Sequence, residues 1–219
     1  MTRWICITIG LAALSGVNAR AQDSKWAIGP HLVFSFPQEE FANVSRTGEG
    51  LGGKLLYRFP GFVSVVPRLY VGFLSYGEKR NEERIQRSGY FIVTTRNESF
   101  QVTLGPQFSQ RIGRVTPYFA PMGGLYVYRT VVSIPDLYYY YGIPAAETTD
   151  SLTRLGWNIN GGIMIDIGLG PHIDIGFKYQ TIPNAVETET EVEGESVRIK
   201  SDATDFIVSI GVVFYLKND

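Results

Sequence analysis

The stretch Ser209-Ile-Gly-Val-Val-Phe-Tyr-Leu216, close to the C-terminus, decides how the rest of the chain is interpreted. Side chains of a β-strand alternate between two faces, and the alternation here begins at Phe206. One face is wholly apolar and consists of Phe206, Val208, Ile210, Val212, Phe214 and Leu216. The other face is mixed and contains Ile207, Ser209, Gly211, Val213 and Tyr215. Half-buried strands of soluble proteins alternate in the same way, so this stretch alone leaves a membrane strand and a soluble strand open.

The N-terminus has the pattern of a cleavable export signal. Arg3 precedes an apolar run from Ile5 to Leu14, and Ala19-Arg20-Ala21 matches the small-any-small pattern of a cleavage site. The apolar run is shorter than the roughly 20 residues that a membrane-spanning helix needs. We therefore predict a signal peptide at residues 1–21 and one exported domain at residues 22–219.

The composition fits more than one kind of exported protein. The 219 residues carry a formal net charge of -1, which gives no basic footprint for nucleic acid. A hydrophobic content of 44% suits a soluble protein. It also suits a membrane β-barrel, because only one face of each strand meets lipid. The single cysteine, Cys6, falls within the predicted signal, so the exported domain is expected to have neither disulfides nor thiol chemistry.

Seven other stretches alternate as the C-terminal one does. The expected strands cover residues 25–36, 50–59, 65–74, 100–109, 115–128, 155–167 and 172–180, and the fourth could begin as early as Tyr90. Their connections alternate between short turns and long loops. The last two strands are expected to continue as a hairpin that turns near Glu193-Gly194. An even number of antiparallel strands, with short turns at one rim and long loops at the other, is the plan of bacterial outer-membrane barrels.

Two barrels of opposite facing compete for this pattern. A soluble lipocalin-like barrel also has eight strands, but it needs its apolar set inside. Its outer surface would then carry Leu56, Tyr70, Leu74, Met122 and Tyr126 together with several glycines. A mixture of small, polar and a few large residues suits a narrow, crowded lumen, and a uniformly apolar set suits lipid. We therefore predict that the apolar set faces outward.

With these features, the chain resembles the small eight-stranded outer-membrane proteins, the group of OmpX and the OmpA membrane domain. The resemblance implies an all-β fold, an eight-stranded antiparallel up-and-down transmembrane β-barrel in the outer membrane of a Gram-negative bacterium. It also implies contact with outer-membrane lipid, lipopolysaccharide and the barrel-assembly machinery. In the C-terminal assembly signal of such proteins, Ser209 takes the polar slot, Gly211 the glycine slot, and Phe214 and Leu216 the apolar slots. The tail Lys217-Asn218-Asp219 departs from that pattern, which more often stops on an aromatic residue.

Six charged side chains are expected inside the barrel, namely Lys54, Arg58, Arg68, Asp166, Asp174 and Lys178. Buried charges must pair or carry hydrogen bonds, and an eight-stranded lumen is narrow enough for side chains to fill. Because the second and third strands should lie across from the sixth and seventh, we predict arginine–aspartate pairs and a plugged lumen. A narrow porin-like channel for small solutes is the alternative.

The histidines do not form a recognisable catalytic set. His31 and His172 fall on different strands at different heights, and neither has a serine or an acid near it in a known order. We therefore predict no enzymatic activity, no metal and no cofactor, with a membrane-embedded lipid-modifying enzyme as an alternative. The acidic run from Glu187 to Glu195 is interpreted as a solvated hairpin edge rather than a cation site.

The long segment between the fifth and sixth strands is the most suggestive for binding. Tyr138, Tyr139, Tyr140 and Tyr141 follow one another in it. Tyrosine is favoured in recognition surfaces because it is large, rigid and amphipathic. We predict that this loop binds an extracellular protein, a glycan or lipopolysaccharide. The alternative is that the tyrosines form an aromatic girdle at the membrane interface or pack on the other loops.

Overall fold

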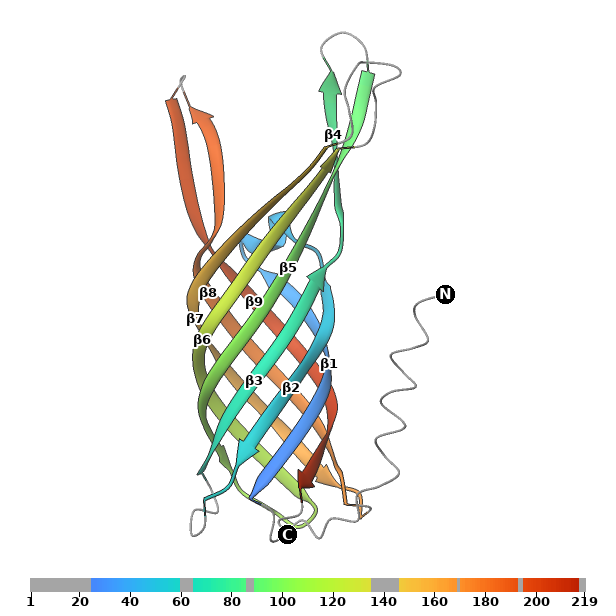
Figure 1. Cartoon of the computed structure of the whole chain (residues 1–219), viewed down its shortest axis with the longest axis vertical. Helices are drawn as coiled ribbons and strands as arrows, with labels where there is room; N and C mark the ends of the chain where they lie inside the picture. Colours follow the sequence, from blue (N-terminus) through green and yellow to red (C-terminus); the bar gives the residue numbers. More distant parts are fainter. Residues whose placement is uncertain are drawn as a thin grey trace.

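The computed structural model describes residues 25–59, 65–85, 89–134, 146–168, 170–192 and 195–216. Within these residues the chain forms nine strands and one short helix (Figure 1). They are β1 Trp26–Gln38, α2 Phe41–Val44, β2 Gly48–Tyr57, β3 Val65–Tyr76, β4 Lys79–Ile85, β5 Gly89–Ser109, β6 Val115–Ile134, β7 Ala146–Asp166, β8 His172–Val192 and β9 Glu195–Leu216. The predicted signal peptide, the four-tyrosine loop and the C-terminal tail lie outside the described residues.

Eight of the strands close into an antiparallel barrel. The order around the sheet is β3-β2-β1-β9-β8-β7-β6-β5, and β3 also pairs with β5. The C-terminal strand completes the circle against the first, since Trp26 pairs with Leu216 and Phe36 with Phe206. Each predicted strand is present, and the predicted eight-stranded barrel is confirmed. No helix among the described residues is long and apolar enough to cross a membrane.

The strands extend beyond the barrel at one end only, which we call the loop end (top of Figure 1); the other end is the turn end. There β8 and β9 form a hairpin whose last pair is Val192 with Glu195, as predicted. A second hairpin, β4–β5, was not predicted; it lies where a long loop between the third and fourth strands was expected. In it Lys79 pairs with Thr95 and Ile85 with Gly89. Charges on both faces gave this segment no amphipathic signal, and backbone pairing forms the strand without it.

The apolar set faces outward, as the sequence predicted. Trp157 is 44% exposed and Leu104 61%, whereas Tyr126 on the inner face is fully buried. Aromatic side chains gather on the outside near the turn end, where the ring of Tyr57 lies 4.5 Å from that of Trp26 and 4.8 Å from that of Phe59. Such aromatic girdles mark the edges of the apolar band on membrane barrels. The inside-out soluble barrel is therefore wrong for this chain.

Candidate functional site

The lumen is closed by side chains in three layers. At the loop end an apolar layer, the upper cluster, contains Val33, Phe41, Leu74, Tyr76, Tyr126, Tyr128, Ile182, Ala185, Ala203 and Ile207. At the turn end a second apolar layer, the lower cluster, contains Ala27, Leu56, Val66, Tyr118, Met164, Val213 and Tyr215. Between them lies the polar centre, whose buried side chains are His31, Lys54, Arg68, Gln101, Gln107, Asp174, Lys178, Gln180 and Asp205. Asp205 also contacts the upper cluster through Tyr76.

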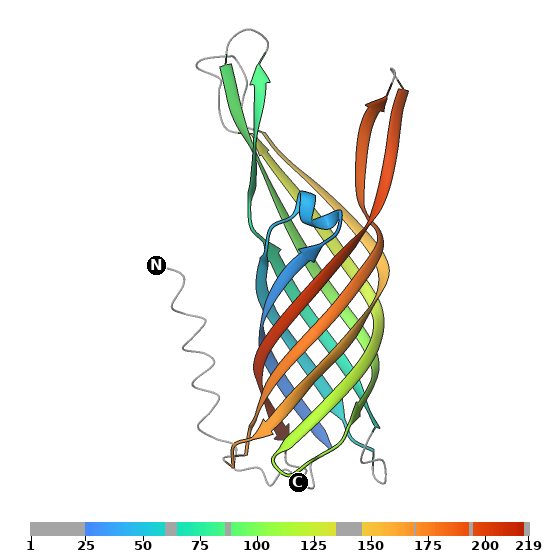
Figure 2. The same ribbon diagram turned by 180° about the vertical axis from the view of Figure 1, so that it is seen from behind.

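The short helix α2 covers the mouth of the barrel at the loop end (Figure 2). Its first residue, Phe41, is fully buried and packs edge-on against the rings of Tyr76 at 5.2 Å and Tyr128 at 5.6 Å. Just after the helix, the Ser45 hydroxyl hydrogen-bonds with the Tyr128 hydroxyl (3.2 Å) and accepts the Asn97 amide (2.8 Å). An aromatic anchor and a buried polar contact therefore hold the first loop over the lumen.

Asp174 on β8 collects two basic side chains from β1 and β2. Its Oδ2 atom contacts His31 Nε2 and accepts Lys54 Nζ at 2.7 Å. All three side chains are almost completely buried. In the barrel wall, Asp174 pairs with Gly211, which in turn pairs with His31. Since Gly211 has no side chain, the imidazole and the carboxylate meet across it.

Asp205 on β9 forms a second carboxylate site nearer the loop end. It is fully buried and accepts hydrogen bonds from Ser35 Oγ at 2.9 Å, Tyr76 Oη at 2.8 Å and Gln180 Nε2 at 2.9 Å. All three donors are neutral. Asp205 was not predicted from the sequence, although it continues the inward alternation of Ile207 and Ser209. Extending the inward alternation from Ile207 back to the residue before Phe206 would have identified Asp205.

Two further cations have no carboxylate within salt-bridge distance among the described residues. Arg68 Nη1 donates to Gln107 Oε1 at 3.3 Å, and Lys178 Nζ donates to Gln101 Oε1 at 2.9 Å. Both lie against the ring of Tyr70, at 5.9 Å for the guanidinium carbon and 4.6 Å for the ammonium nitrogen. The polar centre therefore holds these cations through amide oxygens and aromatic faces.

The remaining predicted charges lie at the turn end, outside the polar centre. Arg58 lies over the ring of Tyr215, 5.8 Å from its centre. Asp166 accepts hydrogen bonds from Arg111 at 3.0 Å and from the backbone N–H of Gly168 at 2.8 Å. The bond from Arg111 links the turn after β5 to the end of β7. His172 packs edge-on against Tyr215 and lies 3.8 Å from the Asp166 carboxylate.

The predicted arginine–aspartate pairs are wrong. Asp174 contacts Lys54 and His31. Asp166 pairs with Arg111 from the neighbouring turn, and Arg68 donates a hydrogen bond to Gln107. The prediction placed opposite strands face to face. It did not allow for inward-facing glycines such as Gly211, across which side chains of the strands on either side can meet. His31 therefore does have an acidic neighbour, 143 residues away in the chain, where no local pattern reveals it.

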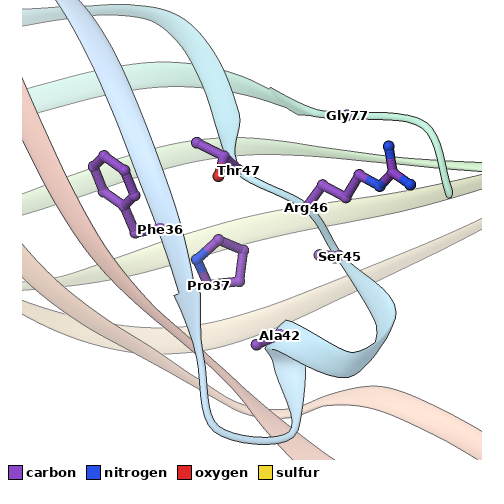
Figure 3. Close-up of a pocket in the computed structure, with 7 residues that line it drawn as sticks. All are labelled: Phe36, Pro37, Ala42, Ser45, Arg46, Thr47 and Gly77. Atoms are coloured by element: carbon purple, nitrogen blue, oxygen red, sulfur yellow. The ribbon is translucent and has the colours of Figure 1, made fainter.

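No group of three His, Cys, Asp or Glu side chains in the described part of the chain is placed to share a metal ion. A groove of about 550 Å³ does exist outside the lumen, at the loop end between β1, α2 and the residue after β3. Figure 3 shows the rings of Phe36 and Pro37 on one side and the Arg46 side chain on the other. Ala42, Ser45, Thr47 and Gly77 complete the lining.

The comparison with known proteins rests on structure. No protein-family model matches the chain, and no curated protein sequence matches it. The crystal structure of Neisserial surface protein A superposes with a TM-score of 0.53 at 14% identity, covering 88% of this chain and 98% of the other. The fold is that of the small outer-membrane β-barrels. The expected resemblance is thus confirmed for architecture, and 14% identity transfers no role.

Two other outer-membrane structures are also similar to the chain. OprG from Pseudomonas aeruginosa gives a TM-score of 0.49 at 11% identity, covering 88% of this chain and 97% of the other. Ail, the attachment invasion locus protein of Yersinia pestis, gives 0.47 at 14% identity, covering 87% of this chain and 99% of the other.

Proposed function

We propose that the protein is an integral outer-membrane barrel with a structural or surface-interaction role. The outward apolar band, the aromatic rings near the turn end and the export signal predicted at the N-terminus support membrane residence. Outer-membrane fractionation, together with a gel-mobility shift on heating in detergent, tests it. A chain recovered in the soluble periplasmic fraction, with no mobility shift, would contradict the proposal.

The observation that carries the proposed role is the filled lumen. The polar centre lies between two apolar clusters, and α2 covers the mouth with the fully buried Phe41. An ion crossing such a barrel would have to shed its water against apolar side chains at two levels, which is costly. We therefore propose that side chains plug the lumen and that the barrel does not transport solutes.

Planar-bilayer recording tests the plug. The purified protein should insert without stable conductance steps, while an open porin in the same bilayer serves as the positive control. Steady, voltage-independent conductance from the wild-type protein would favour the porin-like alternative and reject the plug.

The His31–Asp174 contact is proposed to be structural rather than catalytic. The imidazole Nε2 is engaged by the carboxylate, and Lys54 shares the same oxygen. The contact is also buried between the two clusters, where a lipid substrate has no route. Mass spectrometry of lipid A from cells with and without the protein tests this. A reproducible mass shift that disappears in a His31→Gln variant would favour the lipid-modifying alternative.

The loop with Tyr138 to Tyr141 is proposed to present the partner-binding surface for an extracellular protein or glycan. β6 and β7 flank this loop, and their pairing continues to Ile134 with Ala146. Deletion of the four tyrosines should abolish cell-surface binding of the partner. A control deletion of Glu193-Gly194 in the other hairpin should not. Unchanged binding after the tyrosine deletion would contradict the proposal.

The groove beside Arg46 is proposed as a contact for lipopolysaccharide. Phe36 is 40% exposed on the lipid-facing side of β1, so the groove continues the apolar band upward to a guanidinium. A phosphorylated glycolipid matches both parts. Arg46→Ala should reduce co-purifying lipopolysaccharide relative to wild type, whereas Arg111→Ala at the turn end should not. Equal amounts in all three proteins would reject this contact.

A further inference from the structure

The polar centre of the lumen carries more positive than negative charge. Its buried charged side chains are three cations, Lys54, Arg68 and Lys178, and two carboxylates, Asp174 and Asp205. Lys54 and Asp174 form one ion pair at 2.7 Å. Arg68 and Lys178 have no carboxylate within salt-bridge distance among the described residues, and the second carboxylate, Asp205, accepts hydrogen bonds from three neutral groups. An unbalanced charge in such a place is costly unless a counter-ion accompanies it.

Hydrogen-bond donors without partners lie on Arg68 itself and along the inner face of β5, the strand whose two glutamine amides hold these cations. The Nε atom of Arg68 makes no hydrogen bond in the described part of the structure, and neither do the amide nitrogens of Gln101 and Gln107. The Ser99 and Thr103 hydroxyls, on the same inner face of β5, are also unpartnered. Each of these side chains is at least nine-tenths buried.

The orientation of the two amides is set by the cations. The oxygen of Gln101 accepts Lys178, and the oxygen of Gln107 accepts Arg68. Each NH₂ group is therefore turned away from its cation and has no acceptor. Since an amide has one acceptor end and one donor end, flipping it would set NH₂ against a positive charge. No described residue offers these donors an acceptor, so a bound group has to supply one.

We propose that the polar centre binds one small monovalent anion, such as a halide, between Arg68, Lys178 and the donors of β5. A water molecule accepts hydrogen bonds but leaves the extra positive charge in place. A single monovalent anion between Arg68 and Lys178 gives an acceptor to the donors nearest to it and balances three cations against two carboxylates. The acceptor atoms that also lack partners, Asp174 Oδ1 and Gln180 Oε1, lie on β8. The site does not depend on what the loops bind.

Bromide is the probe, because it scatters X-rays anomalously. The protein is folded and crystallised with sodium bromide as the only halide. We expect an anomalous peak in the lumen beside Arg68 and Lys178. The Lys178→Met variant has two buried cations and two buried carboxylates, so it needs no anion and should lose the peak. Arg129→Gln removes the same charge from a half-exposed surface position and should keep it. No peak in the wild-type lumen, or an equal peak in Lys178→Met, overturns the proposal.

Salt-dependent stability gives a second readout. The heat-induced mobility shift of wild-type protein should occur at lower temperature in sodium gluconate than in sodium bromide, because gluconate is too large for the lumen. Lys178→Met should unfold at the same temperature in both salts. Equal unfolding temperatures of the wild type in both salts would also overturn the proposal. That is the result expected if Lys178 carries no charge. If Lys178→Met does not fold, the wild-type bromide map and salt comparison decide.

Discussion

Gly211 lies on the inner wall between His31 and Asp174 and brings them together by having no side chain. A Cβ at this position would overlap the imidazole and the carbonyl oxygen of Pro30. The same holds elsewhere on the inner face, where a Cβ at Gly52 would overlap the Tyr70 hydroxyl. Glycine in this narrow barrel therefore determines which large side chains meet.

Replacing Asp174 with Asn should destabilise the barrel strongly. Lys54 would remain buried without a carboxylate, and breaking a buried pair in this way costs about 3–5 kcal/mol. Urea unfolding in detergent micelles, followed by tryptophan fluorescence, measures the change. Asp166→Asn is the control, since that partly exposed pair at the turn end should contribute no more than about 1 kcal/mol. Equal effects of the two variants would mean that Asp174 does not hold Lys54 in charged form.

Gly50→Ala should also destabilise the barrel, by about 2 kcal/mol, because the new methyl group has no space. Its Cβ would overlap the carbonyl oxygen of Phe73 and lie 2.9 Å from the Cα of Leu74. Gly53→Ala, on the same strand, is the matched control. The nearest atom to that Cβ is the Gly29 oxygen at 4.0 Å. We expect Gly53→Ala to be neutral or to stabilise by up to about 1 kcal/mol. A reversal of this order in urea unfolding would contradict the strand facing.

At the scale of elements, α2 shows how a four-residue helix is held without a cap of its own. No side chain caps its N-terminus. Its position depends on the packing of Phe41 against Tyr76 and Tyr128, and on the contacts of Ser45. Short helices are unstable in isolation, so this one exists because the aromatic layer beneath it accepts its first residue.

Phe41→Ala should therefore release α2 from the mouth of the barrel and weaken the upper cluster. Truncating a fully buried phenylalanine costs about 3–5 kcal/mol in a packed core. The loss should appear in urea unfolding and as faster proteolysis of the first loop. Glu40→Ala, one residue earlier and exposed, should leave both unchanged. If Phe41→Ala unfolded like the wild type, the packing of α2 would not contribute to stability.

The whole molecule is organised by what surrounds it. Leu104 is 61% exposed and lies on β5 midway between Phe100 and Phe108, which are also exposed. Such a surface would be a liability in water, because large exposed apolar patches promote association. In a bilayer it is the condition for stability.

Leu104→Arg should lower stability in lipid vesicles by about 2–4 kcal/mol, the cost of a basic residue at the bilayer midplane of a barrel. Gln110→Arg, exposed beyond the strand end, should have little effect. Folding into vesicles monitored in urea separates the two variants. Tolerance of arginine at Leu104 would place this face outside the hydrocarbon region.

Strand count, facing and closure followed from the sequence because they depend on period-two alternation, which is local. The alternation in Trp157, Ile159, Ile163 and their neighbours specified the outward face before any contact was known. The β4 strand escaped prediction because its sequence is charged on both faces. The composition of the lumen was predictable in part, and Asp205 was within reach of the same alternation.

Which side chains meet inside the barrel was decided only by the tertiary structure. Inward position is a property of each strand, but contact between His31, Lys54 and Asp174 depends on how β1, β2 and β8 are staggered around β9. That stagger, and the glycine gaps that let long side chains cross, are set by closure of the whole sheet. Alternation along a strand therefore determined the barrel and its facing, whereas the pairing of buried charges required the closed circle.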